Sequence, residues 1–204
     1  MTNSSDILPR QIQISRSTGE TQIELALNID GTGLHKVDTG VPFFDHMLTQ
    51  IAVHGMFDLN LHAEGDLQID PHHTIEDVGL TLGQAFRQAL GERRGIVRMA
   101  SAYCTMDESL AFVAIDLSGR PYAVIQIDWH APTVGGIPAS LFAHFLESFA
   151  LEAHCNLHTR LLYGRDDHHQ AEAIFKALGR ALDAASRIDP RRVDMIPSSK
   201  GILF

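Results

Sequence analysis

Alternating apolar and polar residues predict strands in both halves of the chain. The stretches "TQIELALNIDGTG" (21–33) and "LAFVAIDLSGRP" (110–121) place an apolar side chain at nearly every second position and end in glycine turns. This period of two is typical of a strand that buries one face. Two further alternating stretches, "FDLNLHAEGDLQI" (57–69) and "CNLHTRLLYG" (155–164), predict a later strand in each half.

Between these strands the apolar positions change to helical spacing. The stretches "VPFFDHMLTQIAVHG" (41–55) and "IPASLFAHFLESFALEAH" (137–154) each carry a proline near the start, where a helix tolerates it. Both contain Phe, any residue, His, any residue and Leu, as Phe44, His46, Leu48 and as Phe142, His144, Leu146. We therefore predict two equivalent helices.

A second pair of helices is predicted at the two places where the sequence contains adjacent histidines. The stretches "HHTIEDVGLTLGQAF" (72–86) and "HHQAEAIFKALGRAL" (168–182) share a glutamate four positions after the first histidine and a later Leu-Gly. Asp70 and Asp167 precede these helices and are predicted as their N-caps.

The order strands, helix, strand, helix thus occurs twice, and such self-similarity indicates an internal duplication. We predict one compact α+β unit with half-repeats 1–92 and 93–204, whose seam is "LGERRGIVR" (90–98) and whose C-terminal tail binds phosphate. Strand pairs joined by short glycine turns should be antiparallel, which argues against a doubly wound parallel sheet.

Composition narrows the class of protein. The 204 residues are 45% hydrophobic, without a signal-peptide-like start or an apolar run of membrane-spanning length, so we expect a cytoplasmic protein. A net charge of -9 disfavours nucleic acid and anionic membrane as partners. Cys104 and Cys155 lie in mostly apolar segments, and we expect two buried thiols rather than a disulfide.

The chain contains 12 histidines, and their clustering suggests metal or proton chemistry. Histidine and glutamate four residues apart share a helix face and can chelate one ion, whereas adjacent histidines point about 100° apart. If the halves pack about a pseudo-twofold axis, each leftover histidine can complete the site of the other half. We predict site 1 from His72, Glu76, His144 and His169, and site 2 from His46, His73, His168 and Glu172.

Imidazole and carboxylate ligands suit a borderline or moderately hard divalent ion, and ligand type leaves Mn, Fe, Co and Zn open. Structural zinc would more often use cysteine. Among the other candidates, Arg98, Arg120 and Lys200 lie beside glycine turns or small hydroxyl residues, a context that suits phosphate binding. The remaining histidines with no matching context are expected to face solvent: His35, His62, His130 and His158.

Six motifs occur in the order expected for one family: "FFDHML", "DPHHTIEDVG", "DLSGRP", "HHQAEAIFKALGRAL", "DPRR" and "IPSSKG". From about Arg10 to Gly201 the chain resembles the imidazoleglycerol-phosphate dehydratases, hydro-lyases of L-histidine biosynthesis. The visible departure is "WHAPTVGGIPASL". The resemblance implies mixed sheets that enclose a helical layer, in the ribosomal protein S5 domain 2-like fold. It also implies two Mn²⁺ per active site and trimers assembled into a homo-24-mer.

The resemblance implies the same eight metal ligands that the repeat predicts. It further implies substrate phosphate contacts from Arg98, Arg120, Ser198, Ser199 and Lys200, and other substrate contacts from Glu20, His54 and Lys176. The expected reaction converts D-erythro-imidazoleglycerol phosphate to imidazole-acetol phosphate and water, through a metal-bound imidazolate and a diazafulvene-like intermediate. Glu20 is the leading acid/base candidate, followed by a metal-bound water or His54.

Two other readings of the histidines stay open. A zinc-dependent hydrolase would use a metal-bound water and consume water instead of releasing it. A metal-stabilised assembly without catalysis would saturate the coordination of the ion and need no substrate pocket, whereas the basic "SGRP" and "SSKG" segments favour a phosphorylated ligand.

Overall fold

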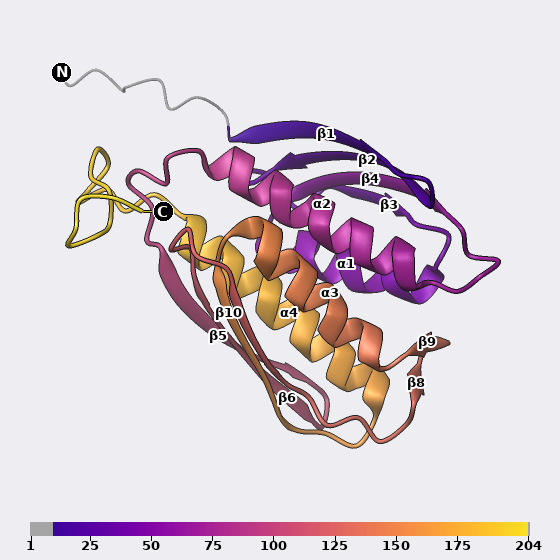
Figure 1. The fold of residues 1–204 in the computed structure, drawn as a ribbon. Coiled ribbons are helices and arrows are strands. Elements are labelled where there is room, and N and C mark those ends of the chain that lie inside the picture. Colours follow the sequence, from indigo (N-terminus) through magenta and orange to yellow (C-terminus); the bar gives the residue numbers. More distant parts are fainter. Residues whose placement is uncertain (1–9, 204) are drawn as a thin grey trace.

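The computed structural model describes residues 10–203, and within them two four-stranded sheets enclose a layer of helices (Figure 1). The first half consists of β1 (Gln11–Ser17), β2 (Thr21–Asn28), β3 (His35–Asp38), α1 (Pro42–Gly55), β4 (Asp58–Gly65) and α2 (His72–Leu90). The second half consists of β5 (Met99–Met106), β6 (Ser109–Asp116), β7 (Tyr122–Gln126), β8 (Thr133–Val134), β9 (Ile137–Pro138), α3 (Ser140–Ala153), β10 (Asn156–Tyr163) and α4 (Asp167–Ser186). The predicted duplicated α+β fold is confirmed.

Both sheets are mixed and have the same topology. Their strand orders are β1-β2-β4-β3 and β5-β6-β10-β7, with the last strand of each parallel to its neighbour and the other pairs antiparallel. The strands that flank the glycine turns, β2 with β3 and β6 with β7, run antiparallel as predicted, but β4 and β10 lie between them. The Asp58 carboxylate at the start of β4 accepts the N–H groups of Thr32 (2.8 Å) and Leu34 (3.0 Å), which fixes the turn around the inserted strand.

The core lies between the sheets and is filled by the inward side chains of the alternating strands. In β2, for example, Ile23, Leu25 and Leu27 are buried while the intervening residues are more exposed. Burial of one face explains the period of two in the sequence. Cys104 and Cys155 are both buried and unpaired, as predicted. Within the described residues, no helix has the length and apolarity needed to cross a membrane.

Glycines let the helices approach closely in two pairs, α2 with α3 and α1 with α4. A Cβ atom on Gly83 would lie 2.4 Å from the carbonyl oxygen of Phe149, and one on Gly179 would lie 2.7 Å from that of Ile51. Gly83 and Gly179 are the glycines of the repeated Leu-Gly. The repeat therefore marks two equivalent helix contacts, which bring His72 beside His144 and His168 beside His46.

The structure corrects three predicted helix starts, those of α2, α3 and α4. The N-cap of α4 is Asp166, not Asp167, and its side chain accepts the N–H groups of His168 and His169. Asp167 lies inside the first turn, where its carboxylate accepts the N–H groups of His130 (3.1 Å) and Ala131 (2.8 Å). This contact with a distant loop is invisible to local sequence.

At the start of α2, Pro71 occupies the N-cap position, but Asp70 still accepts the N–H of His72 at 2.7 Å. The helix predicted from residue 137 begins at Ser140, because Ile137 and Pro138 form β9 in a small hairpin with β8. This hairpin lies in the stretch that departs from the family pattern.

Arg93 holds together the segment between α2 and β5. Its side chain is buried, and its guanidinium donates to the carbonyl oxygens of Leu117 (3.3 Å), Ala153 (3.0 Å) and His154 (3.3 Å). The C-terminal tail packs against the same segment, since Gly95 donates its N–H to the Met195 carbonyl at 2.9 Å. The seam and the tail therefore form one end of the molecule (Figure 1).

Candidate metal centres

The first candidate centre, group one, consists of His72 and Glu76 on α2 and His144 on α3. The Nε2 atoms of His72 and His144 lie 3.7 and 3.5 Å from Oε2 of Glu76, and the three candidate ligand atoms lie within 4.8 Å of one another. The Nε2 atom of His144 is buried and makes no hydrogen bond. A buried polar atom without a partner is costly, so its place among two other potential ligands fits a cation.

The second candidate centre, group two, consists of His46 on α1 and of His168 and Glu172 on α4. One carboxylate oxygen of Glu172 lies 2.9 Å from Nε2 of His46 and 3.1 Å from Nε2 of His168. The other oxygen accepts Lys176 Nζ at 2.6 Å. Burial alone would raise the pKa of Glu172, but hydrogen bonds from Lys176 and His46 lower it to about 2, so the carboxylate is ionised and available to a metal.

Each group therefore supplies two imidazoles and one carboxylate to a shared point, a donor set that fits a divalent transition metal. The tight packing of α2 on α3 and of α1 on α4 produces this convergence. Three of the four ligands predicted for each site lie together within one chain: His72, Glu76 and His144 for site 1, and His46, His168 and Glu172 for site 2.

The remaining two predicted ligands, His73 and His169, lie outside both groups. His73 Nδ1 lies 3.0 Å from Asp66 Oδ2, and His169 Nδ1 lies 2.8 Å from Glu108 Oε2. These hydrogen bonds raise the pKa of both imidazoles. A single chain thus does not complete either four-ligand set, and the assignment of His169 to site 1 and His73 to site 2 stays a prediction.

Glu20 lies in the β1–β2 turn close to the first histidine pair. Its Oε1 atom is 3.8 Å from Nε2 of His73, and 54% of its side chain is exposed. The carboxylate is thus next to a predicted metal ligand and accessible to a small molecule.

His54 and Lys176 lie near group two. His54 is in the last turn of α1, where burial and the positive charges of Lys176 and Arg180 lower the pKa of its imidazole. His154, the C-cap of α3, is in the left-handed conformation like Met56 after α1, and its Nε2 lies 2.7 Å from Nη1 of Arg87. The four histidines predicted to face solvent are exposed: His35, His62, His130 and His158.

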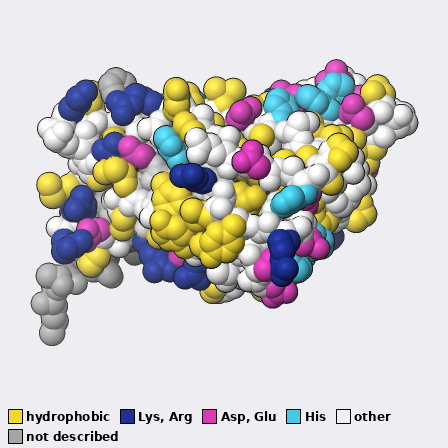
Figure 2. All heavy atoms as spheres, turned by 90° about the horizontal axis from the view of Figure 1, so that it is seen from below, with side chains coloured by type: hydrophobic (Ala, Val, Ile, Leu, Met, Phe, Trp, Pro, Cys, Tyr) yellow, Lys and Arg dark blue, Asp and Glu magenta, His cyan; other side chains and the backbone are white. Residues whose placement is uncertain are grey.

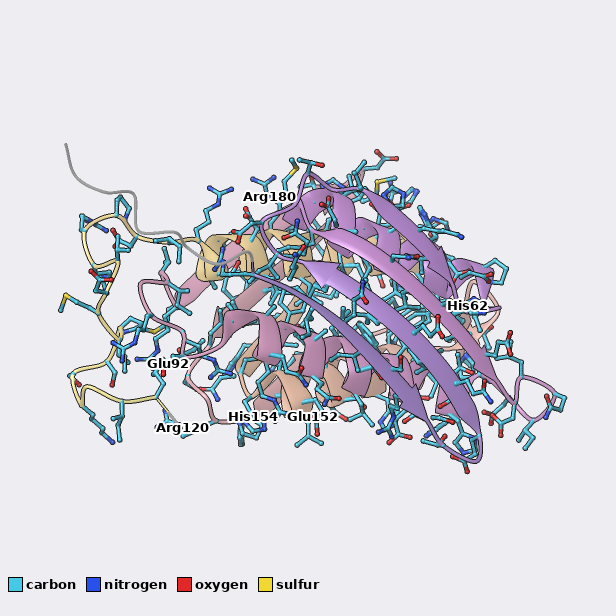
Figure 3. The ribbon with its side chains drawn as sticks, turned by 90° about the horizontal axis from the view of Figure 1, so that it is seen from above. His62, Glu92, Arg120, Glu152, His154 and Arg180 are labelled. Atoms are coloured by element: carbon cyan, nitrogen blue, oxygen red, sulfur yellow. The ribbon has the colours of Figure 1, made fainter. Side chains whose placement is uncertain are left out.

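The predicted phosphate ligands gather at the other end of the helices. The Arg98 guanidinium binds the Asp116 carboxylate at 2.7 and 2.9 Å and donates to the Pro197 carbonyl at 2.8 Å. The bond to the Pro197 carbonyl places the tail residues Ser198, Ser199 and Lys200 next to Arg98. Arg120, in the turn after β6, lies at the same end (Figure 3).

Two clusters of opposite character therefore occupy opposite ends of the molecule. Arg98 donates its N–H to the carbonyl of Ala185, near the end of α4, whereas His168 lies at the start of that helix. A rise of about 1.5 Å per residue puts these two positions roughly 25 Å apart. Figure 2 shows basic side chains toward the tail end, and histidines and carboxylates toward the other.

Asp66 and Glu108 are the functional candidates that sequence reasoning missed. Glu108 is 61 residues from His169, so no local spacing connects them. The repeat could have pointed to Glu108. Thr21 and Ser109 are the buried first residues of the equivalent strands β2 and β6, so the residues just before them, Glu20 and Glu108, are aligned.

The fold and the two candidate centres define the protein as a duplicated α+β protein with two matched groups of histidine and glutamate that could each hold a metal ion. The family profile described as imidazoleglycerol-phosphate dehydratase matches residues 39–182, more than half of the chain. The chain therefore belongs to the imidazoleglycerol-phosphate dehydratase family.

Relatives of that name agree over nearly the full length. The protein of Roseiflexus sp. (strain RS-1) is 60% identical over 95% of this chain and 98% of its own, and that of Dehalococcoides mccartyi (strain CBDB1) is 58% identical over 95% and 97%. The Staphylococcus aureus dehydratase crystal structure matches with a TM-score of 0.79 at 34% identity, covering 88% of this chain and 99% of that one. The Pyrococcus furiosus structure in complex with (S)-C348 matches with a TM-score of 0.81 at 33% identity, covering 93% and 100%.

Proposed function

We propose that this protein removes water from D-erythro-imidazoleglycerol phosphate to give imidazole-acetol phosphate, as a hydro-lyase of L-histidine biosynthesis in the cytoplasm. The observation that carries the proposal is the pair of matched groups, each with two histidines and a glutamate, in a chain whose relatives bear the name of that dehydratase. An imidazole substrate has two ring nitrogens, so two metal centres of the same composition suit it better than one.

Group one and group two would each hold a divalent cation, and we propose Mn²⁺, two per active site. The unpartnered Nε2 of His144 supports this, as does the Glu172 oxygen that faces both His46 and His168. Bound cations would stabilise negative charge on the substrate ring and so make the neighbouring hydroxyl a better leaving group. Zinc, iron and cobalt suit the same donors, and binding measurements with each ion distinguish them.

The residues of the chain must take a proton from carbon, and the enol must then gain a proton at the carbon attached to the ring and lose the proton on its oxygen. Dehydration breaks a C–O bond at the carbon attached to the ring and a C–H bond at the next carbon, and the resulting enol becomes the ketone. Glu20 is proposed to take the carbon-bound proton, because its carboxylate is exposed and lies 3.8 Å from Nε2 of His73. His54 stays the second candidate, and Lys176 is proposed to contact substrate beside group two.

The positions of the phosphate candidates support an active site built from more than one copy of the chain. Arg98, Arg120 and the tail serines and lysine are proposed to bind the substrate phosphate, yet the backbone of Arg98 lies roughly 25 Å along α4 from His168 of group two in its own chain. A substrate with a three-carbon side chain cannot span that distance. We propose that a neighbouring copy supplies one of the two parts, in a homo-24-mer of trimers.

Removal and return of metal tests the proposal. We expect protein treated with a chelator to lose turnover of imidazoleglycerol phosphate and to regain it with Mn²⁺, while the product shows loss of one water. Turnover that persists without metal contradicts the metal-dependent mechanism. A product that has gained water supports the rival hydrolase, and metal binding without any turnover supports the rival assembly.

A further inference from the structure

We infer that Glu108 and Asp66 are positioning residues, which hold the ring proton of His169 and of His73 on Nδ1 and so present Nε2 as the metal-binding atom. This inference rests on the proposed metal-dependent function. It concerns two carboxylates that do not belong to the predicted ligand sets and that come from different parts of the repeat.

The geometry around Glu108 fixes one proton of His169 on Nδ1. Oε2 of Glu108 lies 2.8 Å from Nδ1 of His169, and Oε1 accepts the N–H groups of Arg165 (3.1 Å) and Asp166 (2.9 Å). An ionised carboxylate only accepts hydrogen bonds, so Nδ1 must be the donor. In the neutral imidazole the lone pair then lies on Nε2, which is the form that binds a metal.

Asp66 gives His73 the same arrangement from a different place in the fold. Its Oδ2 and Oδ1 atoms lie 3.0 and 3.2 Å from Nδ1 of His73, and it follows β4 instead of lying in a hairpin. In the first half the residue aligned with Glu108 is Glu20, which lies 3.8 Å from the opposite nitrogen of the ring, Nε2. The two halves thus fix the same ring nitrogen with carboxylates that are not equivalent, and this leaves Glu20 unengaged with Nδ1.

The surroundings of the two carboxylates predict different responses to the isosteric amide. In Glu108→Gln, the two backbone donors at Arg165 and Asp166 retain the side-chain oxygen, which turns the NH₂ group toward His169. Nδ1 must then accept a hydrogen bond, and the ring proton moves to Nε2, where it competes with the metal. In Asp66→Asn, no backbone N–H of the described residues fixes the amide, so its oxygen can turn to Nδ1 and preserve the original tautomer.

The test combines a tautomer measurement on metal-free protein with Mn²⁺ binding. Histidine ring nitrogens are labelled with ¹⁵N and observed by magic-angle-spinning NMR of the whole assembly, and His169 is identified by the signal lost in His169→Gln. In the parent protein we expect the proton on Nδ1 of both His73 and His169. It should stay on Nδ1 of His73 in Asp66→Asn and move to Nε2 of His169 in Glu108→Gln. Competition with a fluorescent chelator should show Mn²⁺ affinity about 10- to 100-fold weaker in Glu108→Gln, the range typical of lost carboxylate–histidine support.

Glu64→Gln is the matched control, because Glu64 is an exposed carboxylate 3.4 Å from the ring of a histidine that is not a predicted ligand, His62 (Figure 3). It should leave both readouts unchanged. A purely structural role predicts that Glu108→Gln, which keeps both backbone hydrogen bonds, retains the tautomer and the affinity, and that result overturns the inference. Failure of the parent protein to bind Mn²⁺ would instead contradict the proposed function, while the tautomers would still report on Glu108.

Discussion

Two glutamates at equivalent turns of the repeat have different neighbours. Glu108 is engaged by His169 and by two backbone N–H groups, whereas Glu20 is half exposed and only approaches His73. Glu108 also accepts the Ser109 hydroxyl at 3.2 Å, and a carboxylate engaged by four donors is stabilised in its ionised form and is a poor proton acceptor. The contrast favours Glu20 as the group that exchanges a proton with substrate.

Glu20→Gln should therefore lower kcat by about 100-fold or more, because general acid–base catalysis typically contributes that much. Substrate binding should change far less, since the amide retains the size of the side chain. Steady-state kinetics with imidazoleglycerol phosphate measure both quantities. Glu24→Gln, at an exposed position of β2, serves as the control. A kcat for Glu20→Gln equal to that of the parent protein would remove Glu20 from the proton transfer.

Asp58 gives a pH-dependent contribution to stability. Hydrogen bonds from the N–H of Thr32, opposed by partial burial and aided by the N–H of Leu34, lower the pKa of its carboxyl group. Because the pKa is lower in the folded state, this stabilisation is complete above the unfolded value, near 4, and is lost as the pH falls through the folded value.

Asp58→Ala should lower the free energy of unfolding by about 1–2 kcal/mol at pH 7, the typical net value of a few such bonds. The difference from the parent protein should shrink below about pH 4, since the parent carboxylate then becomes protonated. Urea unfolding at fixed protein concentration across this pH range is the measurement. A difference that stays constant or grows in acid would contradict the assignment.

At the scale of elements, the close approach of paired helices positions the metal groups. Group one spans α2 and α3, and group two spans α1 and α4, so the distance between ligands depends on how near the helix axes lie. Gly83 permits this contact on α2, where a Cβ would meet two backbone atoms, Phe149 O at 2.4 Å and Ala153 N at 2.8 Å. Backbone cannot move aside as easily as a flexible side chain.

Gly83→Ala should destabilise the protein, although alanine is favoured over glycine in a helix by about 1 kcal/mol. Overpacking typically costs about 1–3 kcal/mol, and here it should exceed the helical gain. Gly79→Ala is the graded comparison, because its nearest contact is 3.0 Å, and its effect should be smaller. Thermal unfolding and Mn²⁺ affinity are the readouts; a Gly83→Ala variant as stable as the parent would show that α2 and α3 can separate without loss.

At the scale of the whole molecule, the helices separate the metal groups from the phosphate candidates. The tail is held near Arg98 through its bond to the Pro197 carbonyl, at the end where α2 and α4 finish (Figure 1). The metal groups lie where the same helices begin. One rigid chain therefore cannot present both parts to one small substrate, and a composite site follows if both parts are needed.

Complementation between inactive variants tests this separation. Glu172→Gln removes a proposed metal ligand and Lys200→Ala removes a proposed phosphate ligand, and each variant should be nearly inactive alone. Assemblies formed from equal amounts of both should regain about a quarter of the parent activity, because random pairing in a symmetric oligomer leaves that share of composite sites intact. Mixed assemblies with no more activity than the separate variants would place the whole site within one chain. The control is a double variant with both changes on one chain, and assemblies made of this variant alone should be inactive.

Local sequence determined the four α-helices, the strands β2, β4, β6 and β10, and the histidine–glutamate pairs that share a helix face. Alternation in β2 requires one buried strand face, and a glutamate four residues after a histidine must share its helix face, whatever the rest of the chain does. The repeated order of motifs then gave the duplicated α+β fold.

Only the tertiary structure decided which distant groups meet. Strand β4 inserts between β2 and β3, the Asp167 carboxylate binds a loop instead of capping its helix, and Glu108 reaches a histidine 61 residues away. None of these contacts follows from periodicity, because each depends on how separate elements pack against one another. Packing also left His73 and His169 outside the groups of their own chain, since adjacent histidines on a helix point to different sides.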